Sequence, residues 1–409
     1  MASWQDPFSP SWGSGVLPGT LTHFVQFKGC SPLRPNGTDY KSLCVMNNYE
    51  YLKLNVYNPE LINLSILALL FILCCVSIQK TEVQNLLTVE QSNQLKGFAI
   101  VLIILGHLWV HVVDSLPKLL FGGEAVALFL LLSGYGLTCS YRSRVVPHRA
   151  YFMARMKKVM VPYWIITVFL LSLDFMILNK TYSLQDIIMT MLGININTTT
   201  RYIDYVRWFI TFILIWYVFF FIAISYFKDG YRLFFLIICA VILFPLDYYI
   251  TQLGFYQVFA FPIGCTMGYY YKDLNSAFKR QPTFFISIAV TLLIVVILYK
   301  FASSRIFYPF VPTIIIKAID EGSSIAFCAA LVIISATIGF YGYQSLLLSF
   351  LGTISYELFL LHGAFLIKYN PIINRSEASL PLTFSVFMFS ISIISWIIHL
   401  SIVKVYVKK

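Results

Sequence analysis

The sequence predicts an all-α membrane protein, a polytopic bundle of about eleven transmembrane helices. Of the 409 residues, 59% are hydrophobic and only 11% are charged, whereas about 25% of the residues in a soluble domain are charged. From Leu61 onward, apolar runs follow one another, and each has about the twenty residues that cross a bilayer. Aromatic residues make up 17% of the chain, which favours aromatic belts at two membrane interfaces.

Residues 1–60 differ from the rest and predict an extracytoplasmic tail. They contain a Pro-, Gly- and Ser-rich stretch and no run that could span a membrane, and they lack the pattern of a cleavable signal peptide. Cys30 and Cys44 flank a polar stretch of this tail. Outside the cell they could form a disulfide, and two free thiols are an equal alternative.

The spans are expected in the following order. Residues 61–79 form an extra helix, and a cytoplasmic linker continues to residue 92. Ten further spans belong to the region 93–409, and we expect them at 95–113, 124–141, 159–178, 208–227, 233–250, 255–271, 283–299, 322–341, 345–366 and 381–403.

The distribution of lysine and arginine predicts the orientation. With the N-terminus outside, the cytoplasmic loops hold 16 basic residues against four acidic ones, and segment 142–158 alone has six basic residues and no acid. Basic residues concentrate on the cytoplasmic side of membrane proteins, so topology explains the net charge of +11 better than nucleic-acid binding does. The C-terminus is then cytoplasmic. Five Asn-x-Ser/Thr sequons, which begin at Asn36, Asn63, Asn179, Asn197 and Asn374, all fall on the predicted outer side.

The predicted helix 95–113 is the most informative, because it holds ionisable residues at membrane depth. Lys96 and His107 are eleven residues apart, so they share one helix face and lie about 16 Å apart along the axis. Such residues normally face a bundle interior or a water-filled cavity. Lys96 could instead extend to the interface, whereas His107 lies too deep for that. His111 could join His107 as a metal ligand, but no third ligand is evident and we expect no metal.

Six segments of the chain form an ordered pattern. The first is the Lys-x10-His pair of Lys96 and His107, and the others are Leu128–Leu137, Tyr151–Trp164, Arg207–Ile210, Phe261–Gly264 and Ile354–His362. In this order they resemble the membrane-bound acyltransferase-3 family, whose members O-acylate sugars and cell-envelope polysaccharides. Lys96 and Lys158 stand where the family usually has arginine, so the charge is kept and bidentate geometry is lost.

The resemblance implies that region 93–409 is a membrane acyltransferase domain in a plasma or inner membrane. It implies an acyl-CoA donor, with acetyl-CoA expected, and an exported sugar, polysaccharide or lipid-linked glycan as the acceptor. No permanently bound cofactor is implied. The candidate catalytic residues are His107 as the base, Lys96, and Glu357, which could orient His107, counter Lys96 or form a structural salt bridge.

Further candidates would contact the two substrates. Those for acyl-CoA are Arg155, Lys158, Ser133 and Tyr135, and those for the acceptor are His111, Tyr356, His362 and Trp208. Membrane topology alone equally explains the basic segment around Arg155. Ser133-Gly134 could serve close helix approach, and both tyrosines could be packing aromatics. The alternative function is a transporter or flippase in which the histidine, lysine and glutamate form a polar relay.

Overall fold

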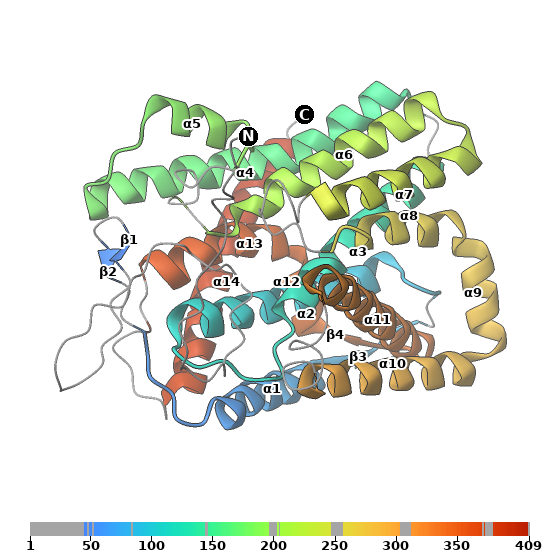
Figure 1. Ribbon diagram of the computed structural model, residues 1–409, viewed down its shortest axis with the longest axis horizontal. Coiled ribbons are helices and arrows are strands. Elements are labelled where there is room, and N and C mark those ends of the chain that lie inside the picture. The colour runs from blue at the N-terminus through green and yellow to red at the C-terminus, as the bar shows by residue number, and fades with distance from the viewer. Residues whose placement is uncertain are drawn as a thin grey trace, which may run out of the picture. The chain divides into compact units, whose positions relative to one another are not determined.

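The computed structural model describes residues 45–46, 49–50, 53–82, 85–143, 146–195, 203, 205–246, 257–302, 312–369, 372 and 379–407. Most of the predicted tail, with Cys30, Cys44 and the sequon at Asn36, lies outside these residues, as do Asn197 and Asn374. The described residues are almost entirely helical, which confirms the predicted all-α bundle (Figure 1).

The helices begin and end as follows. They are α1 Pro59–Val76, α2 Val89–His107, η1 Leu108–Val112, α3 Gly122–Arg142, α4 His148–Leu178, α5 Leu184–Met191, η3 Tyr205–Arg207, α6 Trp208–Tyr226, α7 Asp229–Leu246, α8 Ala260–Tyr269, α9 Tyr271–Arg280, α10 Pro282–Ala302, α11 Thr313–Phe340, α12 Leu346–Thr353, α13 Ser355–Gly363, η6 Ala364–Lys368 and α14 Leu380–Val407. Two short strand pairs complete the described elements: β1 Val45–Met46 with β2 Tyr49–Glu50, and β3 Ile78–Lys80 with β4 Tyr343–Ser345.

Eight of the described helices are long and apolar enough to cross a membrane, and a ninth crossing results if α12 and α13–η6 form one span bent by 67°. This count is lower than the eleven predicted spans. The two predicted spans that this count leaves out, 233–250 and 255–271, overlap α7 and α8. The described part of α8 has only 10 residues, fewer than the roughly twenty of a full crossing.

Glycines let two helix pairs in the centre of the bundle approach closely. A Cβ atom on Gly264 of α8 would lie 2.0 Å from the Leu131 carbonyl oxygen of α3, and one on Gly134 would lie 2.2 Å from the Phe261 carbonyl oxygen. Between α2 and α12, a Cβ on Gly352 would lie 1.8 Å from the Asn93 carbonyl oxygen. Close backbone packing of this kind is a main source of helix association in membranes.

One end of the bundle, here called the basic end, carries Lys80, Arg142, Arg155 and Lys279. There β3 pairs antiparallel with β4. The start of α2 is fixed at this end by a capping box in which Thr88 and Gln91 bond to each other's backbone amides, an arrangement that satisfies two otherwise open N–H groups.

The other end, here called the histidine end, is hydrogen-bonded to the part of the chain that precedes α2. Leu54 exchanges two backbone hydrogen bonds with the end of η1, donating to Val112 at 2.8 Å and accepting from Asp114 at 3.1 Å. In α1, Asn63 is fully buried, accepts from Trp109 Nε1 at 2.9 Å and donates to the Leu119 carbonyl at 2.8 Å. Both polar atoms of its amide are therefore occupied inside the protein, and the sequon at Asn63 offers no site for a glycan.

Candidate active site

Two π-helices lie side by side, and each begins within two residues of one of the predicted site histidines. His107 is the last residue of α2 and is followed by η1, while His362 lies one residue before the end of α13, which leads into η6. Widened turns of this kind are rare and occur frequently at functional sites. Here they bring two distant parts of the chain together at membrane depth.

Three imidazole rings converge at these two turns. The His107 ring stacks on that of His111 with 5.3 Å between centroids, and it lies 5.2 Å from the His362 ring. His362 is fully buried, whereas the other two keep part of their surface accessible. We call His107, His111 and His362 the histidine cluster.

The hydrogen bonds of His362 determine its tautomer. Its Nδ1 lies 2.9 Å from the Phe359 carbonyl oxygen and 3.2 Å from that of Leu358. Both of these oxygens are acceptors, so Nδ1 carries the proton and donates it. Nε2 then holds the lone pair, and it has no hydrogen-bond partner among the described residues. A neutral imidazole in this state can accept a proton.

A buried ion pair fixes the far end of η6. Asp174 of α4 is fully buried and accepts from Lys368 Nζ at 2.6 Å, from the Tyr182 hydroxyl at 2.6 Å and from the Tyr369 hydroxyl at 2.8 Å. Burial, with the nearby charge of Lys368, holds the pKa of Lys180 below its usual range. This network joins α4 to the turn that follows His362.

Three cations gather at the opposite end of α2. The charges of Arg155 and Lys158, one turn apart on α4, both act on the Lys96 ammonium. Arg155 also donates to Ser140 Oγ at 2.5 Å and lies over the Tyr151 ring, 5.2 Å from its centroid. We call Lys96, Arg155 and Lys158 the basic cluster. A cluster of like charges attracts anions.

A model of the acyltransferase 3 family, described as an acyltransferase domain, matches residues 89–400, well over half of the chain. The chain belongs to the acyltransferase 3 family. The resemblance predicted from the six ordered segments is thereby confirmed. No curated protein and no solved structure matches the sequence.

Glu357 contacts a histidine that is not among the predicted site residues. Glu357 Oε1 lies 2.9 Å from His399 Nδ1 of α14. The partner of Glu357 in this contact is neither His107 nor Lys96, and the catalytic role predicted for Glu357 stays a prediction. His399 could have been found from the sequence, since a histidine inside a predicted span is as costly as His107.

The remaining predicted residues of the acyltransferase take various positions. Ser133 of α3 lies beside Tyr217 of α6. The Tyr135 hydroxyl donates to the Leu87 carbonyl at 2.9 Å. The Tyr356 hydroxyl donates to the Val159 carbonyl at 2.9 Å, and Trp208 packs against Phe209 and Phe212 at the start of α6. These contacts are all within the protein, so they leave the predicted substrate contacts of the four residues untested.

A buried arginine of the acyltransferase was also missed as a candidate. Arg207 is fully buried, donates from Nη1 to Thr167 Oγ1 at 2.6 Å and lies over the Tyr163 ring, 5.2 Å from its centroid. Its turn, η3, contacts α13, the helix of His362. The available signal was a basic residue directly before an apolar run, which also fits an interfacial anchor.

Among the described residues, no group of three metal-ligating side chains could hold a metal ion.

Proposed function

We propose that this membrane acyltransferase moves an acyl group, with acetyl as the expected one, from cytoplasmic acyl-CoA to a hydroxyl of an exported sugar, polysaccharide or lipid-linked glycan. The proposal places the basic end in the cytoplasm and the histidine end outside, as the distribution of lysine and arginine predicts. The observation that carries it is the arrangement on α2: a basic cluster at Lys96 and a histidine cluster eleven residues further along the same face.

The separation of the two clusters suits the donor. Eleven helical residues cover about 16 Å, and the pantetheine arm that joins the phosphates of CoA to its thioester is a chain of comparable length. Phosphate oxygens at Lys96, Arg155 and Lys158 would make charge-assisted hydrogen bonds. The thioester would then lie beside His107.

His107 acts as the base in this proposal. Its partly accessible imidazole takes the proton of the acceptor hydroxyl while that oxygen bonds to the thioester carbonyl carbon. The C–S bond then breaks, and the proton passes from His107 to the CoA thiolate, so the imidazole becomes neutral again. The His362 ring, with Nδ1 engaged by two carbonyls, packs against the His107 ring and can limit the orientations that this ring takes.

Inverted membrane vesicles supplied with radiolabelled acetyl-CoA test this function. Wild-type protein should release CoA and label an acceptor on the far side of the membrane. His107→Ala should lower this activity at least about 100-fold, the usual contribution of a general base. Ser287→Ala is the control, because this residue of α10 is exposed and bonds only within its own helix. Substrate flux without acetyl transfer that survives His107→Ala would indicate the transporter alternative and refute the proposal.

A further inference from the structure

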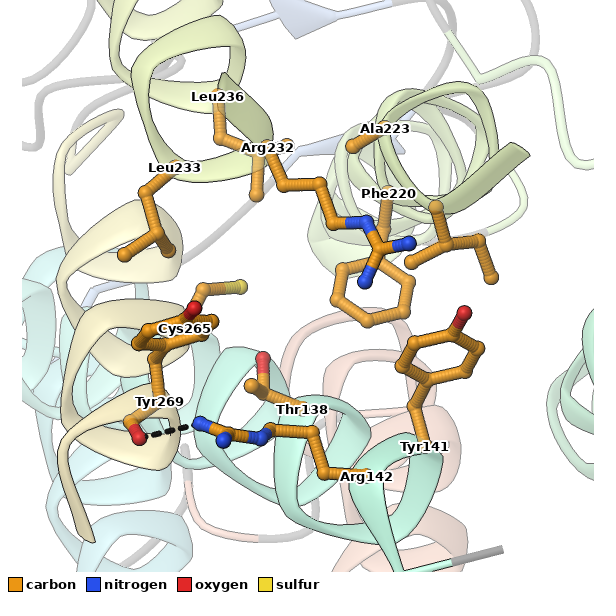
Figure 2. A pocket seen from close by; sticks show the side chains of 11 residues that line it. Thr138, Tyr141, Arg142, Phe220, Ala223, Arg232, Leu233, Leu236, Cys265 and Tyr269 are labelled. Carbon is orange, nitrogen blue, oxygen red and sulfur yellow. Dashed lines mark hydrogen bonds between the residues drawn. The ribbon is translucent and has the colours of Figure 1, made fainter. Parts of the chain in front are cut away.

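A second basic site lies at the basic end, in a pocket between the ends of α3, α6, α7 and α8 (Figure 2). The pocket holds about 350 Å³ of empty space, part of it open to solvent. Arg142 and Arg232 enter it from different helices, and the rings of Tyr141 and Tyr269 line it beside them, as Figure 2 shows. The rest of the lining is mostly apolar, with Phe220 and Leu236 among its members.

Each arginine is held in place by its surroundings. The guanidinium of Arg142 lies over the Tyr269 ring, 4.3 Å from its centroid, and donates to the Tyr269 carbonyl. That of Arg232 lies over the Tyr141 ring, 5.4 Å from its centroid, and bonds to the Phe227 carbonyl and to Asp229. The residues that line the pocket thus include two cations and no carboxylate. Asp229, which pairs with Arg232, is not among them and is largely exposed.

A series of ring contacts connects this pocket to the basic cluster. The Tyr141 ring packs edge-on against that of Tyr151, with 5.6 Å between centroids, and Arg155 lies over the other ring of this pair. Arg155 acts in turn on Lys96. The pocket is therefore one aromatic pair away from the place where the proposed function puts the donor's phosphates.

We propose that this pocket binds the 3′-phosphorylated adenosine of the acyl-CoA donor, an inference that rests on the proposed function. A phosphate needs charged donors of the kind that Arg142 and Arg232 supply. An adenine ring needs apolar and aromatic surface, and arginine planes can also stack on it. With the diphosphate at Lys96, Arg155 and Lys158, the nucleoside lies beyond Arg155, in the neighbouring pocket at the same basic end.

The structure makes a specific prediction about ligand chemistry. Dephospho-CoA differs from CoA only in lacking the 3′-phosphate. If the two arginines bind that phosphate, Arg142→Gln and Arg232→Gln should each weaken CoA binding and leave dephospho-CoA binding nearly unchanged. Loss of a hydrogen bond to a charged group corresponds to at least about a tenfold change in Kd. Arg142→Lys, which keeps the charge and loses the planar fork, should fall between wild type and Arg142→Gln.

Equilibrium binding of tritiated CoA and of dephospho-CoA to purified protein in detergent measures this without any acceptor. The expected result is a dephospho-CoA to CoA ratio of Kd values of about one hundred in wild type, which falls to about ten in each glutamine variant because one arginine remains. Arg280→Gln, on exposed α9 outside the pocket, is the matched control and should keep the wild-type ratio. Elution as a single symmetric peak in size-exclusion chromatography shows that each variant is folded, and the two arginines provide independent variants.

Three outcomes overturn the inference, and they differ in what they say about the proposed function. Failure of wild type to bind CoA would refute the proposed function as well. If the glutamine variants bind CoA and dephospho-CoA equally more weakly, the arginines have a structural role, and acyl-CoA remains the proposed donor. In the third outcome, the ratio of Kd values in the glutamine variants equals that of wild type, and anionic phospholipid in nanodiscs raises the activity of wild type and not that of the variants. This result would assign the pocket to a lipid headgroup.

Discussion

Replacement of Asp174 by asparagine should destabilise the acyltransferase more than any change to a surface ion pair. Asp174 is fully buried, and the side chain of its partner Lys368 is only 9% exposed. Removing one member of such a pair leaves an uncompensated buried charge, which costs about 3–5 kcal/mol. At roughly 2 °C per kcal/mol for a large domain, we expect Tm in detergent to fall by about 6–10 °C.

Thermal unfolding followed by tryptophan fluorescence provides the assay for this change. Asp229→Asn is the matched control, because Asp229 also pairs with a basic residue, Arg232, but is 59% exposed, and pairs of that kind contribute about 0–1 kcal/mol. The double variant Asp174→Asn/Lys368→Met removes both charges and should recover much of the lost stability. A double variant as unstable as Asp174→Asn, or equal shifts in the two single asparagine variants, would refute the reasoning.

Two further predictions concern helix packing. Gly264→Ala would place a Cβ about 2.0 Å from the Leu131 carbonyl oxygen, so we expect α3 and α8 to separate at a cost of about 1–3 kcal/mol. The control is Gly136→Ala, whose added Cβ would have nothing within 4 Å and should leave Tm unchanged in the same measurement. Asn63→Leu leaves the Trp109 indole N–H buried and unbonded, which should lower the free energy of unfolding by about 1–3 kcal/mol; an unchanged Tm would contradict the observed hydrogen bond.

Much of the architecture could be predicted because membrane burial leaves a local record in the sequence. The apolar runs coincide with observed helices, and the position of His107 relative to Lys96 follows from helical geometry alone. The His107 ring packs against the His362 ring, which agrees with an ionisable side chain that faces a bundle interior or a water-filled cavity, since hydrocarbon offers it no partner. Local patterns of this kind require no knowledge of which helices are neighbours.

The partnerships between helices could not be predicted in the same way. The contact between Glu357 and His399 depends on how α13 and α14 are rotated against each other, and apolar sequence does not specify rotation. The approach of His362 to His107 likewise depends on η1 and η6, and no simple pattern of residues marks a π-helix. The pocket around Arg142 brings together the ends of four helices, so its members appear in the sequence as ordinary basic and aromatic loop residues.

The attachment of α1 has a consequence for where this enzyme can be divided. The family match begins at residue 89, yet Asn63 supplies the partner of the Trp109 indole, and Leu54 pairs with the backbone beside Val112. A chain cut at residue 89 would leave the Trp109 N–H and the backbone beside Val112 without these partners, and each buried group left unsatisfied costs about 1–3 kcal/mol. The unit that is inherited across the family is therefore smaller than the unit that must fold together in this protein.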